Sequence, residues 1–332
     1  MSGNGLFICL PIKGRLKSVQ TALMTYELPE NPTLRLPNPV KWGGIFQTAF
    51  SMLSYRHAFH AGNHADMLKH FILYLTLDYF NRKDKPYWYI DTHSGAGLYD
   101  LSGAEAQKVG EYRQGIALLQ NTQVLPETLQ DFLGRLKQIL PQDNLYCGSP
   151  WLAQAMLRNG DKLRLFELHP ADFGHLQNNM QEARLDRRGI VSQTDGYQGL
   201  IALLPPPTRR AVVLIDPPYE EKQDYARVAN TLKEAQKRFA QGCYLVWYPC
   251  LSREESRKLP EQLKKLAPDN YLQAELHVHS PRADGFGMHG SGMFVINPPY
   301  LLAETLQTTL PALVQTLAQD SGARFVLDYQ IK

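Results

Sequence analysis

Four consecutive residues in the second half of the chain, Asp216-Pro217-Pro218-Tyr219, combine the groups that would bind an aromatic amine. The prolines have no N–H to donate and hold φ near about −65°, so the backbone is stiff and its carbonyl oxygens are free to accept hydrogen bonds. The exocyclic amine of adenine is a poor nucleophile because its lone pair is delocalised into the ring. Asp216 and the Pro217 carbonyl would accept its two N–H groups, and Tyr219 would stack on the base.

A second stretch, Asn297-Pro298-Pro299-Tyr300, fits the same pattern and also follows an apolar run. We predict that Asp216 belongs to the functional copy for two reasons. Its predicted strand falls fourth in the series that the glycine-containing loop 91–97 opens, and a carboxylate accepts an amine proton more strongly than an amide does. Asn297 is expected to be the structural end of a late antiparallel strand. Since Asp-Pro-Pro also forms ordinary turns, the four residues alone leave the turn interpretation open.

Segments with strand and helix patterns alternate along most of the chain. Apolar residues at helical spacing predict a helix over 64–80 with Asn63 as its cap. Residues of about 102–145 are helical in pattern without an obvious strand, and we interpret them as an insertion. The alternation predicts an α/β fold with a doubly wound parallel sheet and an antiparallel pair at its end. The expected strands are 87–90, 163–167, 189–192, 211–216, 243–249, 271–278 and 292–297.

The motif at Asp216 resembles the catalytic motif of amino-group methyltransferases that use S-adenosylmethionine, and other predicted strand ends suit that cofactor. Gly95 and Gly97 follow Asp91 and allow close approach of the main chain to the amino-acid part. Glu167 would accept the ribose hydroxyls, and Asp195, followed by Gly196, would accept the adenine amine. The loop lacks the third glycine and the lysine of phosphate-binding loops, which disfavours a dinucleotide or a triphosphate. Each of these positions alone is also compatible with a turn.

Composition limits the classes of protein that this chain can be. Its 332 residues, 44% of them hydrophobic, can bury one large core or two smaller ones. A net charge of +3 leaves no polybasic tail, so any nucleic-acid contact must come from local patches. Four cysteines without metal or disulfide spacing indicate a reducing compartment, and no apolar run approaches the roughly 20 residues of a membrane span. We expect a cytoplasmic protein.

The N-terminal region differs from the rest of the chain. Residues 1–51 are rich in proline and polar breaks, which predicts a poorly ordered extension before a domain over 52–332. The segment 55–64 is dense in histidine, but no cysteine or carboxylate set accompanies it at a familiar spacing, so we expect no metal site. We expect this segment to fold over cofactor and substrate, with Tyr55 near the target base.

Taken together, several motifs make the chain resemble the RlmJ family, bacterial methyltransferases that act on an adenine N6 of large-subunit ribosomal RNA. The resemblance runs from Met52 to near the C-terminus and rests on segments 55–70, 91–97, 148–150, 167–170, 195–196 and 216–219. It implies a Rossmann-like class I S-adenosylmethionine-dependent methyltransferase fold with a helical insertion. It implies catalysis at Asp216, substrate contact at Tyr55 and His57, and cofactor contacts at Lys69, His70, His93, Ser149, Glu167, Asp195 and Gly196.

The resemblance also implies a substrate, adenine A2030 of 23S rRNA, in free or incompletely assembled form, and we expect the protein to act as a monomer. The target adenine must leave its stack to be methylated. Two alternatives share these sequence features. A DNA adenine-N6 methyltransferase would have the same core, and a non-catalytic RNA-binding module would keep the cofactor site without transferring a methyl group.

Overall fold

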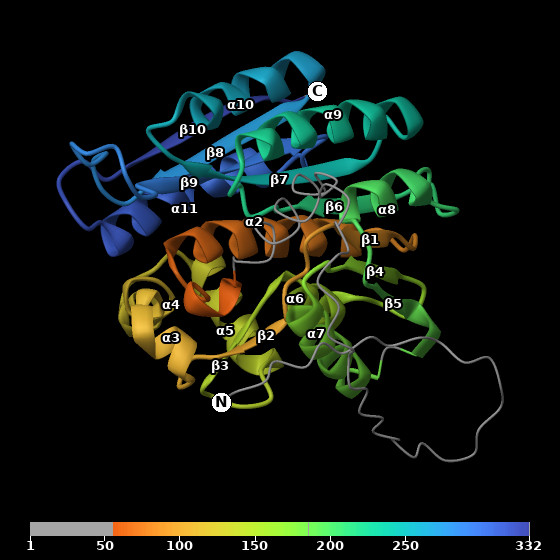
Figure 1. Cartoon of the computed structure of the whole chain (residues 1–332), viewed down its shortest axis with the longest axis horizontal. Coiled ribbons are helices and arrows are strands. Elements are labelled where there is room, and N and C mark those ends of the chain that lie inside the picture. Colours follow the sequence, from red (N-terminus) through yellow and green to blue (C-terminus); the bar gives the residue numbers. More distant parts are fainter. Residues whose placement is uncertain (1–55, 185, 332) are drawn as a thin grey trace, which may run out of the picture. The chain divides into compact units, whose positions relative to one another are not determined.

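A single twisted sheet forms the centre of the fold (Figure 1). The computed structural model describes residues 56–184 and 186–331. In the described part the sheet has eight strands in the order β10-β8-β9-β7-β6-β1-β4-β5. Five strands are parallel, namely β1 (Trp88–Asp91), β4 (Lys162–Phe166), β5 (Gly189–Ser192), β6 (Ala211–Ile215) and β7 (Cys243–Cys250). Three strands run antiparallel to their neighbours, namely β8 (Tyr271–His277), β9 (Gly290–Ile296) and β10 (Arg324–Gln330).

The order of the parallel strands creates a switch point beside β1. The chain builds outward from β1 through β4 to β5, then returns to place β6 and β7 on the other side of β1. Connections on the two sides therefore leave the sheet in opposite directions, which opens a crevice at the carboxyl ends of β1 and β6. In register, Asp91 at the end of β1 lies opposite Leu165 of β4 and Leu214 of β6.

Helices cover both faces of the sheet, so the central strands are apolar on both sides. Within β6, Val212 and Leu214 pack into one cluster, whereas Val213 and Ile215 pack into the other. The first cluster includes side chains of α2 (His64–Asn81), α6 (Ser149–Met156), α7 (Pro170–Glu182) and α11 (Leu302–Leu317). The second includes side chains of α8 (Gly196–Leu203), α9 (Lys222–Arg238) and α10 (Glu254–Leu266).

The predicted helical insertion is present between β1 and α6. It contains α3 (Ala104–Val109), α4 (Ile116–Asn121) and α5 (Glu127–Ile139), with a short 3-10 turn, η2 (Glu111–Gln114), between α3 and α4. Another 3-10 turn, η1 (His57–Phe59), precedes α2. Two short strands flank the region that was predicted to be helical. A two-stranded ribbon of β2 (Leu98–Asp100) and β3 (Leu145–Cys147) closes the insertion, and three-residue strands are too short to show a periodic pattern.

The prediction of a Rossmann-like α/β fold with a helical insertion is confirmed, with one omission at the sheet edge. The antiparallel end has three strands because β10 pairs with β8, and β10 was not predicted. Its residues are exposed or half-buried throughout, so it lacks the alternation that would reveal it. A further 3-10 turn, η3 (Asp186–Arg188), precedes β5. No helix in the described ranges is long and apolar enough to cross a membrane. The proposed extension over 1–51 lies outside the described residues.

Candidate active site

A cavity of about 810 Å³ opens at the switch point of the sheet. Its walls come from the N-terminal turns of α2, from the loops that follow β1, β4, β5, β6 and β7, and from the loop between β8 and β9. Cavities of this size hold a cofactor or a substrate of several hundred daltons. The position is the one at which doubly wound sheets bind their ligands.

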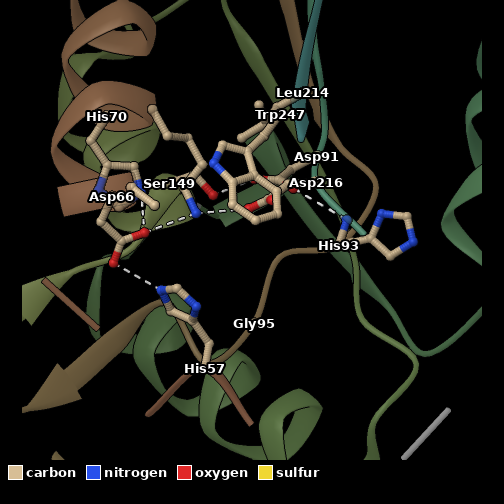
Figure 2. Close-up of polar contacts among 12 residues, drawn as sticks. His57, Asp66, His70, Asp91, His93, Gly95, Ser149, Leu214, Asp216 and Trp247 are labelled. Atoms are coloured by element: carbon tan, nitrogen blue, oxygen red, sulfur yellow. Dashed lines mark hydrogen bonds and ion pairs between the residues drawn. The ribbon is translucent and has the colours of Figure 1, made fainter. Parts of the chain in front are cut away.

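Lys69 of α2 connects Asp66 and Asp216 inside this cavity. Figure 2 labels the two aspartates and marks polar contacts with dashed lines. The Nζ of Lys69 lies 2.7 Å from Asp216 Oδ2 and 2.9 Å from Asp66 Oδ1. Burial alone lowers the pKa of Lys69, but the charges of Asp216 and Asp66 outweigh it and hold that pKa well above its usual value. Lys69 is therefore a cation that donates hydrogen bonds to both carboxylates.

Asp66 anchors the start of α2 to the preceding segment. Its Oδ2 accepts a 2.8 Å bond from the Gly62 N–H and lies 2.9 Å from His57 Nε2. Burial raises the pKa of Asp66, yet its interactions with His57, Lys69 and His70 lower it to well below its ordinary value. Asp66 thus fixes both Lys69 and His57, the residue that the resemblance assigns to the substrate.

The Asp216 motif forms one wall of the cavity. Tyr219 has a positive φ of 51° and packs its ring against Tyr225 and Trp247, at centroid distances of 4.7 and 5.9 Å. Its hydroxyl donates a 2.7 Å bond to the Trp247 carbonyl oxygen. Tyr219 is only 2% exposed, so it lines the cavity as part of a three-ring wall rather than as a free stacking surface. The indole of Trp247 also faces the Lys69 ammonium, at 5.8 Å.

Asp91 lies beneath the cavity and organises the loop after β1. It accepts hydrogen bonds from Tyr89 at 2.8 Å, from Ser149 at 2.7 Å and from the His93 N–H at 3.3 Å. Burial raises the pKa of Asp91 to about 6, because these donors offset only part of the lost hydration. The Ser149 hydroxyl at the start of α6 is therefore committed to Asp91.

Glu167 joins the loop after β1 to the loop after β4. Its Oε2 accepts a 2.7 Å bond from the Gly95 N–H, and its Oε1 accepts a 2.8 Å bond from the His169 N–H. Burial raises the pKa of Glu167 to about 7 despite these two donors. Gly95 has φ +60°, and a Cβ there would meet the Tyr99 hydroxyl at 2.2 Å, so this position requires glycine.

Asp195 caps α8 and pairs with a cation that the sequence did not reveal. Its Oδ1 accepts bonds from the N–H groups of Tyr197 and Gln198, at 3.0 and 3.1 Å, while its Oδ2 pairs with Arg227 of α9. Gly196 is equally constrained, because a Cβ there would lie 1.9 Å from the Thr92 carbonyl oxygen. The Arg227 guanidinium also covers the Tyr197 ring.

Two of the histidines at the cavity, buried His70 and half-buried His93, are neutral. Burial lowers the pKa of His70 and of His93 to about 3 in each case. His70 Nδ1 lies 2.6 Å from the Tyr146 hydroxyl, but its Nε2 is buried without a hydrogen-bond partner among the described residues. An unsatisfied buried nitrogen in a cavity wall is a recognition point for a polar ligand atom.

Comparison with known proteins assigns the family. Residues 84–329 match the family described as "Ribosomal RNA large subunit methyltransferase D, RlmJ". The chain belongs to the RlmJ family. It is 41% identical over 281 residues to "Ribosomal RNA large subunit methyltransferase J" of Haemophilus influenzae, covering 84% of this chain and 99% of that protein. The protein of the same name in Escherichia coli is 44% identical over 264 residues, covering 79% of this chain and 93% of the relative.

A solved structure shares this fold. The crystal structure of a Legionella pneumophila protein matches with a TM-score of 0.74 and 33% identity, covering 82% of this chain and 99% of that chain. The match extends over nearly the whole length of that solved relative.

Most of the residues predicted for an RlmJ-family site line the one cavity. These are His57, Lys69, His70, His93, Gly95, Ser149, Glu167, Asp195, Gly196, Asp216, Pro217 and Tyr219. Tyr55 lies outside the described residues. Lys69 was expected to contact the cofactor, whereas in the structure it bonds Asp216. The histidines near the start of the described chain lie against carboxylates, with His57 on Asp66 and His60 on Glu111.

Asp66, Arg227 and Trp247 are among the cavity residues that were missed from the sequence. A signal for Asp66 did exist, because Asp66, Lys69 and His70 share one face of α2 at i, i+3 and i+4 spacing. No comparable signal in the sequence pointed to Arg227 or Trp247. Arg227 lies on a helix with a mostly polar sequence, and Trp247 sits within the apolar run of β7.

Proposed function

We propose that this chain transfers a methyl group from S-adenosylmethionine to N6 of one adenine, A2030, in 23S rRNA, acting as a cytoplasmic monomer on free or incompletely assembled RNA. Membership of the RlmJ family and the names of the two curated relatives support the substrate class. The Asp216 motif supports an exocyclic amine as the acceptor.

The observation that carries this proposal is the position of Asp216 at the switch point beside Lys69. Lys69 bonds Oδ2 of Asp216, and in the described residues Oδ1 has no donor of its own. Oδ1 and the neighbouring Pro217 carbonyl are thus two acceptors for the two hydrogens of an aromatic amine. Such bonds draw the amine nitrogen toward the tetrahedral geometry that a nucleophile needs.

The cavity also suits a cationic cofactor. Acidic residues outnumber lysines and arginines among its lining side chains by seven to four. Lys69 and Arg227 are already paired with carboxylates, so they do not form a phosphate site. S-adenosylmethionine, when bound, supplies an electrophilic methyl group on a positively charged sulfur.

Several residues of the chain fit the parts of this cofactor. Glu167 retains lone pairs for the ribose hydroxyls, beside the constrained Gly95. His70 Nε2 is a buried nitrogen without a hydrogen-bond partner among the described residues, and we assign it to a polar end of the cofactor. His93 and Gly196 contribute to the wall near the expected adenine, and Ser149 supports Asp91 beneath it.

A methyl-transfer assay with competing acceptors tests the proposal. Purified protein and labelled S-adenosylmethionine are incubated with protein-free 23S rRNA, assembled large subunits or duplex DNA, and the product nucleoside is identified by mass spectrometry. We expect N6-methyladenosine in protein-free 23S rRNA, at a single position that is unmethylated in rRNA from a strain lacking the gene. Transfer mainly to DNA, or cofactor binding without transfer in a single turnover, would contradict it.

A further inference from the structure

The loop between β8 and β9, residues 278–289, stands at the rim of the cavity. Because β9 runs antiparallel to β7, its first residue Gly290 pairs with Cys250 at the end of β7. The loop therefore rises from the same edge of the sheet as Asp216. Arg282, Gly287 and Met288 of this loop line the cavity, as does Arg253 from the loop after β7.

The backbone hydrogen bonds of this loop hold one aromatic side chain in solvent. The Gly285 N–H donates a 2.9 Å bond to the Arg282 carbonyl oxygen, and the Phe286 N–H donates a 3.0 Å bond to Asp284 Oδ1. Gly285 and Gly287 have φ of +72° and +87°, a conformation that costs glycine little. Phe286 between them is 76% exposed.

A single exposed aromatic residue is common on protein surfaces, so its surroundings decide its meaning. Phe286 lies between Arg282 and Gly287, which line the cavity, and Arg253 lines it from the neighbouring loop. In the described chain neither arginine forms a salt bridge. An aromatic ring with unpaired cations at the mouth of a cavity is the combination that binds single-stranded nucleic acid, with stacking on a base and attraction to phosphates.

We propose that Phe286 stacks on a nucleotide that flanks the target adenine, while Arg282 and Arg253 contact the adjoining phosphates. This inference rests on the proposed function and adds an element for binding RNA outside the catalytic cavity. A base turned into the cavity loses its stacking neighbours, and a ring at the rim replaces one of them. The acidic residues of the cavity favour the cationic cofactor, whereas Arg253 and Arg282 at its rim favour the anionic RNA backbone.

Four variants test the role of the ring. Phe286→Ala removes it, Phe286→Leu keeps an apolar side chain without a π face, and Phe286→Tyr keeps the π face. Tyr300→Ala is the matched control, because Tyr300 is 71% exposed but follows the end of β9, at the opposite edge of the sheet from the 278–289 loop. KM for protein-free 23S rRNA, kcat, and the Kd of S-adenosylmethionine are measured for each variant.

Loss of one base–aromatic stack corresponds to roughly 5- to 150-fold in affinity, so we expect KM for RNA to rise about tenfold in Phe286→Ala and Phe286→Leu. Phe286→Tyr and Tyr300→Ala are expected to match wild type, and the Kd of the cofactor to stay constant in all four. An unchanged KM in Phe286→Ala, or full rescue by Phe286→Leu, overturns the inference. Wild-type protein that methylates no RNA contradicts the proposed function instead.

Salt dependence tests the arginine separately. Arg282→Gln removes one cation and is expected to lower the slope of log affinity for RNA against log salt concentration by about one, for whichever RNA sequence is used. Arg324→Gln, on exposed strand β10 and absent from the cavity lining, serves as its control. An unchanged slope in Arg282→Gln would remove this residue from the RNA-binding surface.

Discussion

The chain contains two turns of nearly identical sequence, of which only the first lines the cavity. Asp216-Pro217-Pro218-Tyr219 and Asn297-Pro298-Pro299-Tyr300 each follow a strand that is buried along its whole length, β6 and β9. Each also contains one residue with left-handed backbone, Tyr219 at φ 51° and Asn297 at φ 53°. The two turns are therefore alike in sequence, but the left-handed residue is the last of the first turn and the first of the second.

Strand direction separates the two turns. Strand β6 is parallel to β1 and ends at the cavity, whereas β9 is antiparallel to β7 and ends at the opposite edge. There the Asn297 amide donates to the carbonyl oxygens of Ala240 and Gly242, at 2.8 and 2.7 Å. The first residue of the turn faces the cavity as Asp216 at one edge, whereas at the other edge Asn297 bonds the backbone of the protein itself. A motif thus becomes a site only where the topology opens a crevice beside it.

The largest difference between the turns is expected in catalysis. Asp216→Ala removes an acceptor for the target amine, and we expect kcat to fall by about 10³-fold, since one pre-organised polar group contributes roughly 10²–10³. The Kd of S-adenosylmethionine should change little. Radiolabel transfer to 23S rRNA and calorimetry measure the two quantities. Turnover close to that of wild type would contradict the assignment of Asp216.

The ion pair of Lys69 provides the next largest effect. Lys69→Met leaves Asp66 and Asp216 without their shared cation, and loss of one partner of a buried pair costs about 3–5 kcal/mol in free energy of unfolding. Lys264 is a matched control because it also joins two acids, Glu261 and Asp328, but its own side chain is only half-buried and both acids are exposed. Lys264→Met should cost less than about 1 kcal/mol. Equal losses in urea titrations would show that burial of the Lys69 pair has no energetic consequence.

Much of this organisation could be predicted from sequence because apolar periodicity records burial. The parallel strands and α2 were found within a few residues of their bounds, and so was the cap Asn63, which accepts bonds from Ala65 and Asp66. Strand β10 could not be found because neither of its faces is fully buried. The preference for Asp216 over Asn297 followed from strand order, which the sequence also carries.

Partners across long sequence separations could not be predicted. Lys69 and Asp216 are 147 positions apart, and no local pattern links them. The same holds for Arg227 and Asp195, which meet only after α8 and α9 pack together. Residue types at strand ends therefore indicate the location of a site, whereas the pairing of its charges depends on the tertiary fold.

Asn297 should show the structural role of the second turn. Asn297→Ala removes the amide that bonds Ala240 and Gly242 and places alanine at a positive φ. We expect a loss of about 2–3 kcal/mol in free energy of unfolding, with normal turnover per folded molecule. Denaturant titration measures the free energy of unfolding, and methyl-transfer rates divided by the concentration of folded protein give the turnover. A large loss of turnover in the folded fraction would place this turn in the catalytic machinery.

The acidic edge should also respond to pH. The pKa of Glu167 is raised from 4.5 to about 7, mainly by burial. A carboxylate accepts ribose hydroxyls better than a carboxylic acid, so affinity for S-adenosylmethionine should rise about tenfold from pH 6 to pH 8 and stay flat in Glu167→Gln. The effect on stability has the opposite sign.

Because the folded-state pKa of Glu167 is above its unfolded value, its contribution to stability is full below pH 4.5 and is lost as pH rises through about 7. Relative to Glu167→Gln, wild type should therefore lose thermal stability across this window. Calorimetry at several pH values measures both trends. A pH-independent cofactor Kd in wild type would show that Glu167 does not contact the ribose.

The smallest expected effect separates the two tyrosines that end the turns. Burial holds the pKa of Tyr219 well above its ordinary value, so its hydroxyl is a neutral donor to the Trp247 carbonyl oxygen. Tyr219→Phe should cost about 1 kcal/mol in free energy of unfolding and lower kcat a few-fold, because the three-ring wall beside Asp216 loses its anchor. Tyr300→Phe, at an exposed position, should change neither quantity. If both variants behave like wild type, the Tyr219 ring is held by packing against Tyr225 and Trp247 alone, and the distinction between the turns rests on Asp216 and the direction of its strand.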